Sequence, residues 1–120
     1  MKVAIIGSRN LKVDNLAPYL PSNTTEIVSG GARGVDHCAR EYALTHGIKF
    51  TEFLPDYPKY GHHAPLLRNQ SIIEYADIVL AFWDGSSHGT KYVIETCQKR
   101  GIPHSVFIFS DGINGFIKDD

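Results

Sequence analysis

Three short segments rich in glycine and hydroxyl residues carry the clearest chemistry in this sequence, and each follows a short apolar run. They lie at residues 7–10, 29–34 and 85–90 and read Gly-Ser-Arg-Asn, Ser-Gly-Gly-Ala-Arg-Gly and Gly-Ser-Ser-His-Gly-Thr. In a parallel α/β sheet the strand-to-helix turns all lie along one edge, so we expect the three segments to line a single crevice. Backbone N–H groups and small side chains suit such a crevice to phosphate.

The second segment has the most specific pattern. Gly30, Gly31 and Gly34 permit positive φ angles and close approach to a ligand, and a helix beginning near Gly34 would add free N–H groups and the positive end of its dipole. Arg33 can hold a phosphate through two hydrogen bonds. Asp36 can accept from a ribose hydroxyl or complement the helix dipole. The spacing differs from Gly-x-Gly-x-x-Gly, which disfavours a standard NAD site, and a plain tight turn is the alternative.

The other two segments offer hydroxyls and one histidine. Ser8 can donate to a phosphate or ribose, and the later segment is a second candidate phosphate cradle or an ordinary helix cap. His88 can contact a ligand or carry a proton. The remaining histidines have no metal-ligand spacing, so we expect no metal site. Three aromatic residues can stack a base or pack in the core: Tyr57, Tyr60 and Trp83.

Strands and helices alternate along the chain, which predicts an α/β fold. Apolar runs predict strands at 3–6, 24–28, 48–54, 77–83 and 105–109, and helical patterns predict helices at 14–20, 35–46, 64–75 and 89–100, with a loop at 55–63. This order implies a three-layer α/β/α sandwich, Rossmann-like, around a mostly parallel five-stranded sheet. We expect one domain at residues 1–110 and a polar tail at 111–120.

The amino-acid composition limits the classes of partner that we expect this chain to bind. The chain has 120 residues and a formal net charge of −1, so no overall positive field favours nucleic acid or an anionic membrane. The sequence shows no signal-peptide pattern and no run that could span a bilayer, and we expect a cytoplasmic protein. Cys38 and Cys97 match no metal or redox motif, which favours buried free thiols.

Several of these motifs resemble the SLOG superfamily of Rossmann-like domains, over about residues 2–109. The resemblance is carried by Gly-Ser-Arg at 7–9, Ser-Gly-Gly-Ala-Arg-Gly-Val-Asp at 29–36, Arg-Asn at 68–69, Ala-Asp-Ile-Val at 76–79 and Gly-Thr at 89–90. The sequence looks closest to the YspA/YpsA-like branch. Related members are the DNA-processing protein DprA and the LOG phosphoribohydrolases, which release cytokinin bases.

The resemblance implies that Arg68 and Asn69 face the pocket from the side opposite the glycine-rich turn. In LOG enzymes the matching arginine acts with a glutamate three residues after Gly-Thr, and this chain has Val93 there. Glu95 lies about 200° further round a helix and faces elsewhere. We name Arg68 and Glu95 as the catalytic candidates, but the carboxylate that a LOG-like reaction needs is missing from its expected position.

Three classes of function fit these residues. We favour a small module that binds a nucleotide or nucleotide-derived phosphate ligand, needs no further cofactor and forms a homodimer or higher homo-oligomer. A LOG-like nucleoside-monophosphate hydrolase and a DprA-like single-stranded DNA binder are the alternatives, the latter disfavoured by the charge balance. The predicted ligand-binding residues are Gly7, Ser8, Arg9, Gly30, Gly31, Arg33, Gly34, Asp36, Arg68, Asn69, Gly85, Ser86, Ser87, His88, Gly89 and Thr90.

Overall fold

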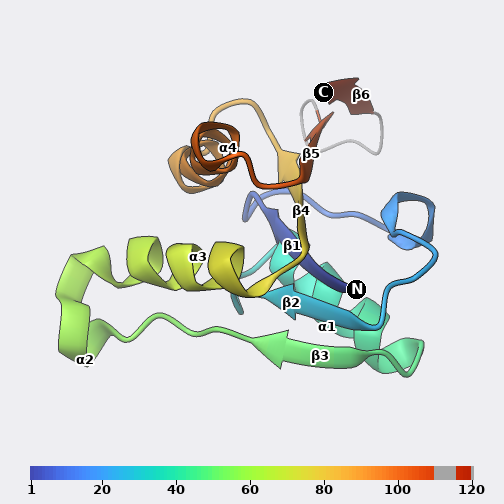
Figure 1. Cartoon of the computed structure of the whole chain (residues 1–120), viewed down its shortest axis with the longest axis horizontal. Coiled ribbons are helices and arrows are strands. Elements are labelled where there is room, and N and C mark those ends of the chain that lie inside the picture. Colours follow the sequence, from blue (N-terminus) through green and yellow to red (C-terminus); the bar gives the residue numbers. More distant parts are fainter. Residues whose placement is uncertain (110–115, 120) are drawn as a thin grey trace.

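A single twisted sheet forms the middle layer of the protein (Figure 1). The structure is a computed structural model, and it describes residues 1–109 and the backbone of residues 116–119. The strand order is β3-β2-β1-β4-β5-β6. The strands are β1 (Lys2–Gly7), β2 (Glu26–Ser29), β3 (Lys49–Glu52), β4 (Ile78–Trp83), β5 (His104–Phe109) and β6 (Phe116–Asp119).

The first five strands are parallel, and β6 pairs antiparallel with β5. The predicted α/β fold with five parallel strands is thus confirmed. The sheet has one strand more than predicted, because residues 116–119, which we expected in a polar tail, extend it at the β5 edge. The rest of that expected tail lies outside the described residues.

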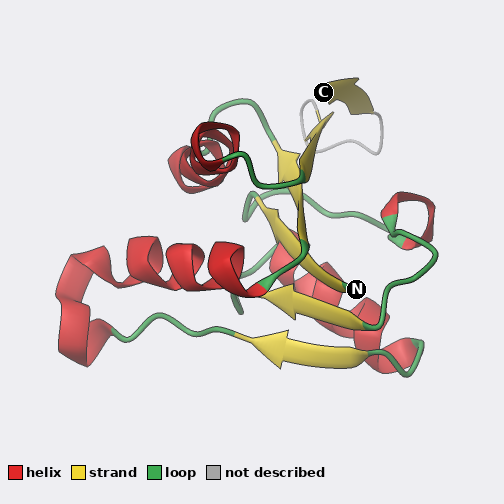
Figure 2. Ribbon diagram, viewed as in Figure 1, coloured by secondary structure: helices red, strands yellow, loops and turns green. Residues whose placement is uncertain are grey.

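Three longer helices cover the two faces of the sheet (Figure 2). Helix α1 (Val35–Thr45) packs on β1, β2 and β3, whereas α3 (Ala64–Tyr75) and α4 (His88–Arg100) pack on the other face and against each other. The result is a three-layer α/β/α sandwich, as predicted. None of the helices in the described ranges is both long enough and apolar enough to cross a membrane.

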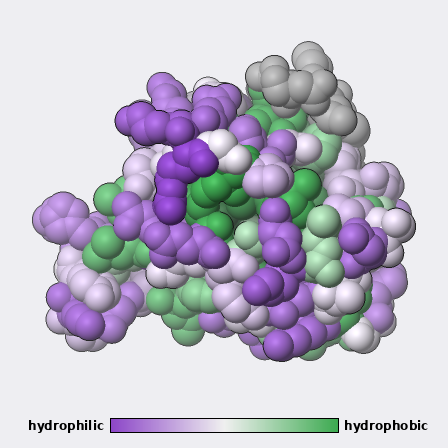
Figure 3. Space-filling view, viewed as in Figure 1, coloured by the Kyte–Doolittle hydropathy of each residue, from purple (hydrophilic) through white to green (hydrophobic). Residues whose placement is uncertain are grey.

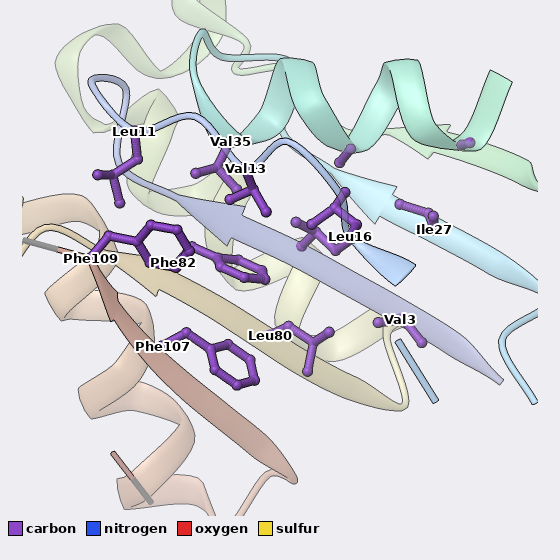
Figure 4. Packing of buried hydrophobic residues seen from close by; sticks show 13 residues of the cluster. Val3, Leu11, Val13, Leu16, Ile27, Val35, Leu80, Phe82, Phe107 and Phe109 are labelled. Carbon is purple, nitrogen blue, oxygen red and sulfur yellow. The ribbon is translucent and has the colours of Figure 1, made fainter. Parts of the chain in front are cut away.

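Alternate residues of the central strand supply the two faces of the core. Val3 and Ile5 of β1 join the cluster under α1, and Ala4 and Ile6 join the cluster under α3 and α4. This is the period of two that a strand imposes on its side chains. On the α1 face the segment after β1 contributes further apolar residues, which Figure 4 shows in the same cluster as Phe82: Leu11, Val13 and Leu16.

Two short connections differ from the prediction. The helix expected at 14–20 is reduced to a 3₁₀ turn, η1 (Ala17–Tyr19), where the Asn15 side chain accepts from the Ala17 N–H at 3.1 Å. The loop expected at 55–63 contains α2 (Tyr57–Tyr60) and η2 (Gly61–His63). A carboxylate oxygen of Asp56 accepts from the Lys59 N–H at 3.2 Å and caps α2. In Figure 1, α2 lies beyond the end of α3, away from the sheet.

A buried carboxylate, Glu26, marks the first position of β2, at the end of the strands away from the strand-to-helix turns. One of its oxygens accepts from the Thr51 and Tyr75 hydroxyls, both at 2.6 Å, and the Lys49 ammonium lies 3.5 Å from the other. Burial raises the pKa of Glu26, but these hydrogen bonds and the Lys49 charge outweigh burial and leave the pKa below its usual value. This network ties together β2, β3 and the end of α3.

Candidate functional site

A cavity of about 420 Å³ lies at the carboxyl ends of β1 and β4. The chain leaves β1 toward β2 on one side, while β4 pairs with β1 on the other, so this is the point at which the strand order reverses. Crevices at such points are the usual ligand sites of open α/β sheets. In the view of Figure 3, polar side chains cover α3 and α4, and apolar side chains gather in a hollow between these helices.

Most of the predicted site residues line this cavity. They come from the turns after β1, β2 and β4 and from the first half of α3, as the sequence predicted. The lining includes Gly7, Ser8, Arg9, Gly30, Asp36, Arg68, Asn69, Ser87, His88, Gly89 and Thr90.

Five predicted residues lie outside the cavity. Gly31, Arg33 and Gly34 line a hollow beside it, which we call the adjacent hollow; the two share Arg9, Asn10 and Ala32. Gly85 and Ser86 do not line the cavity, so the predicted cradle at 85–90 reaches it only from Ser87 onward. Arg33 therefore does not line the main cavity, although it lines a smaller pocket together with Arg68, and its role as a phosphate clamp stays a prediction.

Glycines in these turns make room for other parts of the protein. Gly34 has φ +73°, and a Cβ there would lie 2.5 Å from the Arg9 carbonyl oxygen and 2.6 Å from that of Ser8. The turns after β1 and β2 therefore cross in direct backbone contact. A Cβ at Gly30 would lie 2.5 Å from Nη1 of Arg68. The space that the sequence analysis assigned to a ligand is filled here by an arginine side chain.

Arg68 is held firmly at the wall of the cavity. Its Nε donates to the side-chain oxygen of Asn69 at 2.8 Å, and its Nη1 donates to the carbonyl oxygens of Gly30 and, at 3.4 Å, of Phe53. Burial lowers the pKa of Arg68, and nearby Asp36 opposes this shift. Arginine keeps its charge in proteins, so the cavity contains a fixed cation. The predicted placement of Arg68 and Asn69 on the side facing the glycine-rich turn is found.

Asp36 is a buried carboxylate on the opposite wall, in the first turn of α1. The residue is 6% exposed, and its Oδ2 accepts from the Ala32 N–H at 3.1 Å. Its Oδ1 is shielded from water and accepts no hydrogen bond from any described residue. Burial raises the pKa of Asp36 more than the Ala32 N–H, the charge of Arg68, the Ser29 hydroxyl and the Gly30 N–H lower it. Ser29 itself donates to the Ile5 carbonyl oxygen at 2.8 Å.

The turn before α4 contains its own anion, Asp84. One carboxylate oxygen accepts from the N–H groups of Ser86 and Ser87, at 2.9 and 2.8 Å, and from the Ser87 hydroxyl at 2.9 Å. Burial raises the pKa of Asp84, but these hydrogen bonds outweigh burial and hold the pKa far below its usual value. The polar groups that we expected to cradle a phosphate at Ser86 and Ser87 thus bind Asp84 instead.

Ser8 joins this turn to the end of β1. Its hydroxyl oxygen accepts from the Asp84 N–H at 3.1 Å and lies 2.8 Å from the Ser87 hydroxyl oxygen. Ser8 is 1% exposed, which makes it a link between two turns rather than a free donor. Asp84 was not among the predicted ligand-binding residues, although an aspartate directly before Gly-Ser-Ser is typical of a turn that bonds its own backbone.

The first turn of α4 supplies the free donors of the cavity. The N–H groups of His88, Gly89 and Thr90 have no acceptor within the helix, because the first turn of any α-helix lacks one. All three residues line the cavity, and a Cβ added at Gly89 would meet nothing within 4 Å. An anion can therefore approach this helix terminus closely, where the helix dipole favours negative charge.

The candidates for catalysis are separated by the fold. Val93 is fully buried in the core cluster that contains Ile6 and Ile73, and Glu95 is exposed on α4 and does not line the cavity. Of the two catalytic candidates, Arg68 lines the cavity and Glu95 does not. The carboxylates among the described lining residues are Asp36 and Asp84. Within the described ranges no group of three His, Cys, Asp or Glu side chains is placed to hold a metal ion.

The aromatic residues that we considered as a stacking wall lie elsewhere. Tyr57 lines a smaller pocket with Arg9, Arg33 and Arg68, and Tyr60 lines a groove beside α3. The Trp83 indole donates to the Ser87 carbonyl oxygen at 3.0 Å and supports the turn before α4. The apolar part of the cavity lining is aliphatic instead, with Ile6, Pro65 and Ile72.

Fold and cavity together define a Rossmann-like α/β domain with a crevice at the carboxyl edge of its sheet. Residues 1–59 match the model of the family described as DNA recombination-mediator protein A, so this part of the chain is similar to that family. The match supports the DprA-related part of the predicted resemblance, whereas the YspA/YpsA-like branch and the LOG relationship stay predictions.

A protein from Mycobacterium phage D29, Gene 61 protein, is 39% identical to the chain over 83 residues. The matched region makes up 64% of this chain and 66% of the phage protein, just under two thirds of that relative's length. No solved structure gives a significant match to this chain.

Proposed function

We propose that this protein is a binding module for a nucleotide or a nucleotide-derived phosphate ligand, held in the cavity at the ends of β1 and β4. The observation that carries the proposal is the meeting of two anion-binding elements in one cavity. The free N–H groups of the first α4 turn and the fixed guanidinium of Arg68 line the same space. Each element is well suited to a phosphate oxygen, the first through its dipole and the second through its charge.

The remaining lining supports a ligand larger than phosphate. A cavity of about 420 Å³ falls within the usual range for small-molecule sites. Ile6, Pro65 and Ile72 form an aliphatic wall on the α3 side of the sheet, which suits the flat face of a base. A nucleoside monophosphate combines these requirements, with an anion for the helix terminus and an apolar ring for the aliphatic wall.

Titration calorimetry with adenosine, cytidine, guanosine and uridine monophosphates tests this proposal. Gly89→Val should weaken binding of the tightest ligand at least tenfold, because the new side chain fills open space in front of the α4 amides. The loss of a charged hydrogen bond, about 1.5–3 kcal/mol, sets this scale. Glu95→Val on the same helix is the matched control and should leave affinity unchanged. Failure of all four nucleotides to bind at millimolar concentration would defeat the proposal.

A second candidate is binding of single-stranded DNA along the adjacent hollow. Two observations favour it: the match of residues 1–59 to a family described as DNA recombination-mediator protein A, and the charge of this hollow. Arg9, Lys12, Arg33 and His37 line it, and its described lining residues include no carboxylate. The nearly neutral charge of the whole chain argues against DNA binding, so the electrostatic attraction of DNA would come from this hollow alone.

Fluorescence anisotropy with a labelled oligothymidine at two salt concentrations tests the second candidate. If the adjacent hollow binds the DNA backbone, Arg33→Gln should weaken binding severalfold and reduce the salt dependence by about one charge. The same variant should leave nucleoside monophosphate binding unchanged, because Arg33 does not line the cavity. Equal DNA affinity and equal salt dependence for wild type and Arg33→Gln would exclude this hollow as the DNA site.

A further inference from the structure

The unpartnered oxygen of Asp36 is a polar feature of the cavity that neither of its anion-binding elements explains. Asp36 is 6% exposed, and its Oδ1 is shielded from water without accepting a hydrogen bond from any described residue. A carboxylate oxygen that has lost its hydration and gained no donor is costly. Because the residue lines the cavity, a donor group on a bound ligand would offset this cost.

The surrounding charges decide which donor fits. Arg68 lies close enough to act electrostatically on Asp36, and Arg9 acts in turn on Arg68. Both arginines line the same cavity. An anionic ligand is attracted by these arginines and by the free N–H groups of the first α4 turn, although Asp84 also lines the cavity, and on such a ligand the group that donates to Asp36 is neutral. The donor is therefore a neutral hydroxyl or N–H group on a molecule whose negative charge lies elsewhere.

Position distinguishes the hydroxyl from the N–H of a base. Asp36 is in the first turn of α1, which covers one face of the sheet, whereas the aliphatic wall comes from the opposite face, where Ile6 and Ile72 belong to the α3 and α4 cluster. A base on the aliphatic wall lies across the cavity from Asp36. The sugar, which joins base to phosphate, is the part of a nucleotide left to face α1.

We propose that Asp36 reads the sugar of the ligand, with Oδ1 accepting a hydrogen bond from a ribose hydroxyl. This inference rests on the proposed function and deepens it: the preferred ligand is a ribonucleotide, and the site selects it against a phosphate ligand that lacks the hydroxyl. Rejection of analogues without a hydrogen-bonding group is strong where the protein group is buried and otherwise unpaired.

The test compares adenosine monophosphate with its 2′,3′-dideoxy analogue by calorimetry on the wild-type protein, which needs no variant to fold. We expect the ribonucleotide to bind at least tenfold more tightly. In Asp36→Asn, which removes the charge and keeps the size, the ratio should fall at least about threefold relative to wild type, because a neutral acceptor forms a weaker hydrogen bond than a charged one. Glu41→Gln, on an exposed position of the same helix, is the matched control and should keep the wild-type ratio.

Separate outcomes overturn the inference and the function on which it rests. Equal binding of both nucleotides by the wild type would overturn the role of Asp36 and leave the phosphate site standing. A tenfold ratio that persists in Asp36→Asn would assign the sugar to another group and also overturn the inference. Inosine monophosphate, which lacks the amino group of adenine, distinguishes a donor on the base from a donor on the sugar. If it binds as weakly as the dideoxy analogue, and if Asp36→Asn abolishes this loss of affinity, the donor is on the base and the inference is overturned. Binding of neither nucleotide defeats the proposed function itself.

Discussion

Replacing Gly34 with alanine tests whether the crossing of the turns after β1 and β2 holds the site together. Gly34 has φ +73° and ψ −123°, a conformation that costs an L-residue about 1–3 kcal/mol. The new Cβ would also lie 2.5 and 2.6 Å from two carbonyl oxygens, in backbone that cannot rotate away as a side chain can. Overpacking of this kind adds about 1–3 kcal/mol.

Alanine also restricts the unfolded chain, which returns about 0.4–1 kcal/mol. The expected loss in free energy of unfolding for Gly34→Ala is therefore about 1–5.5 kcal/mol. Gly101→Ala is the matched control: it has φ +68° and ψ 30°, and nothing lies within 4 Å of its Cβ. The left-handed conformation alone costs about 1–2 kcal/mol, so the control should lose about 0–1.5 kcal/mol after the same correction.

Urea unfolding at pH 7, followed by the fluorescence of Trp83, the single tryptophan of the chain, measures both variants. Gly34→Ala should lose at least about 1 kcal/mol more than Gly101→Ala, with the same dependence on urea, because only Gly34 meets backbone overpacking. Losses that agree within about 0.5 kcal/mol would show that the two turns can separate without cost, and would refute the reasoning from their crossing.

Three further predictions concern carboxylates. Asp84→Ala should lose about 1–2 kcal/mol in urea unfolding at pH 7, as for a lost helix cap, and because the pKa of Asp84 is lowered, the difference from wild type should shrink as the pH falls below 3.8. Glu26→Gln should lose about 1–3 kcal/mol, again with a difference that persists above pH 4.5 and shrinks below it; a pH-independent loss would contradict the charged network with Tyr75. Val93→Glu should destabilise the protein by about 3–5 kcal/mol by burying an unpaired charge, while exposed Glu95→Val changes stability by less than about 0.5 kcal/mol. Chromatography should detect no release of adenine from adenosine monophosphate by Val93→Glu, and robust release would restore the hydrolase alternative.

The parallel part of the fold was predictable because its strands are buried on both faces. Val3 to Ile6 form an uninterrupted apolar run, and β4 reads the same way. Strand β6 gave no such signal: it follows a polar stretch and is defined by its pairing with β5, a contact that no local pattern encodes. The short helix α2 was missed because Pro, Tyr and Gly dominate its segment, and a single cap on Asp56 is enough to form it.

The site was predictable in its position but only partly in its chemistry. Strand-to-helix turns of a parallel sheet meet at one edge, so the convergence of Ser8, Gly30 and Gly89 follows from the fold. The group that approaches each glycine, however, does not follow from the fold. Gly30 accommodates Arg68 from a helix 38 residues further along the chain, and Gly34 lies against the turn after β1. Both contacts depend on tertiary packing, and local sequence cannot distinguish them from contact with a ligand.

The carboxylate of Asp84 affects how a ligand would enter and leave the cavity. The turn before α4 is already ordered by its own carboxylate, which accepts from Ser86 and Ser87. A ligand entering the cavity therefore loses no affinity to the conformational entropy of organising this turn. The same negative charge lines the cavity and opposes an arriving phosphate. A preformed turn removes an ordering step from ligand association, whereas a like charge beside the ligand favours its rapid release.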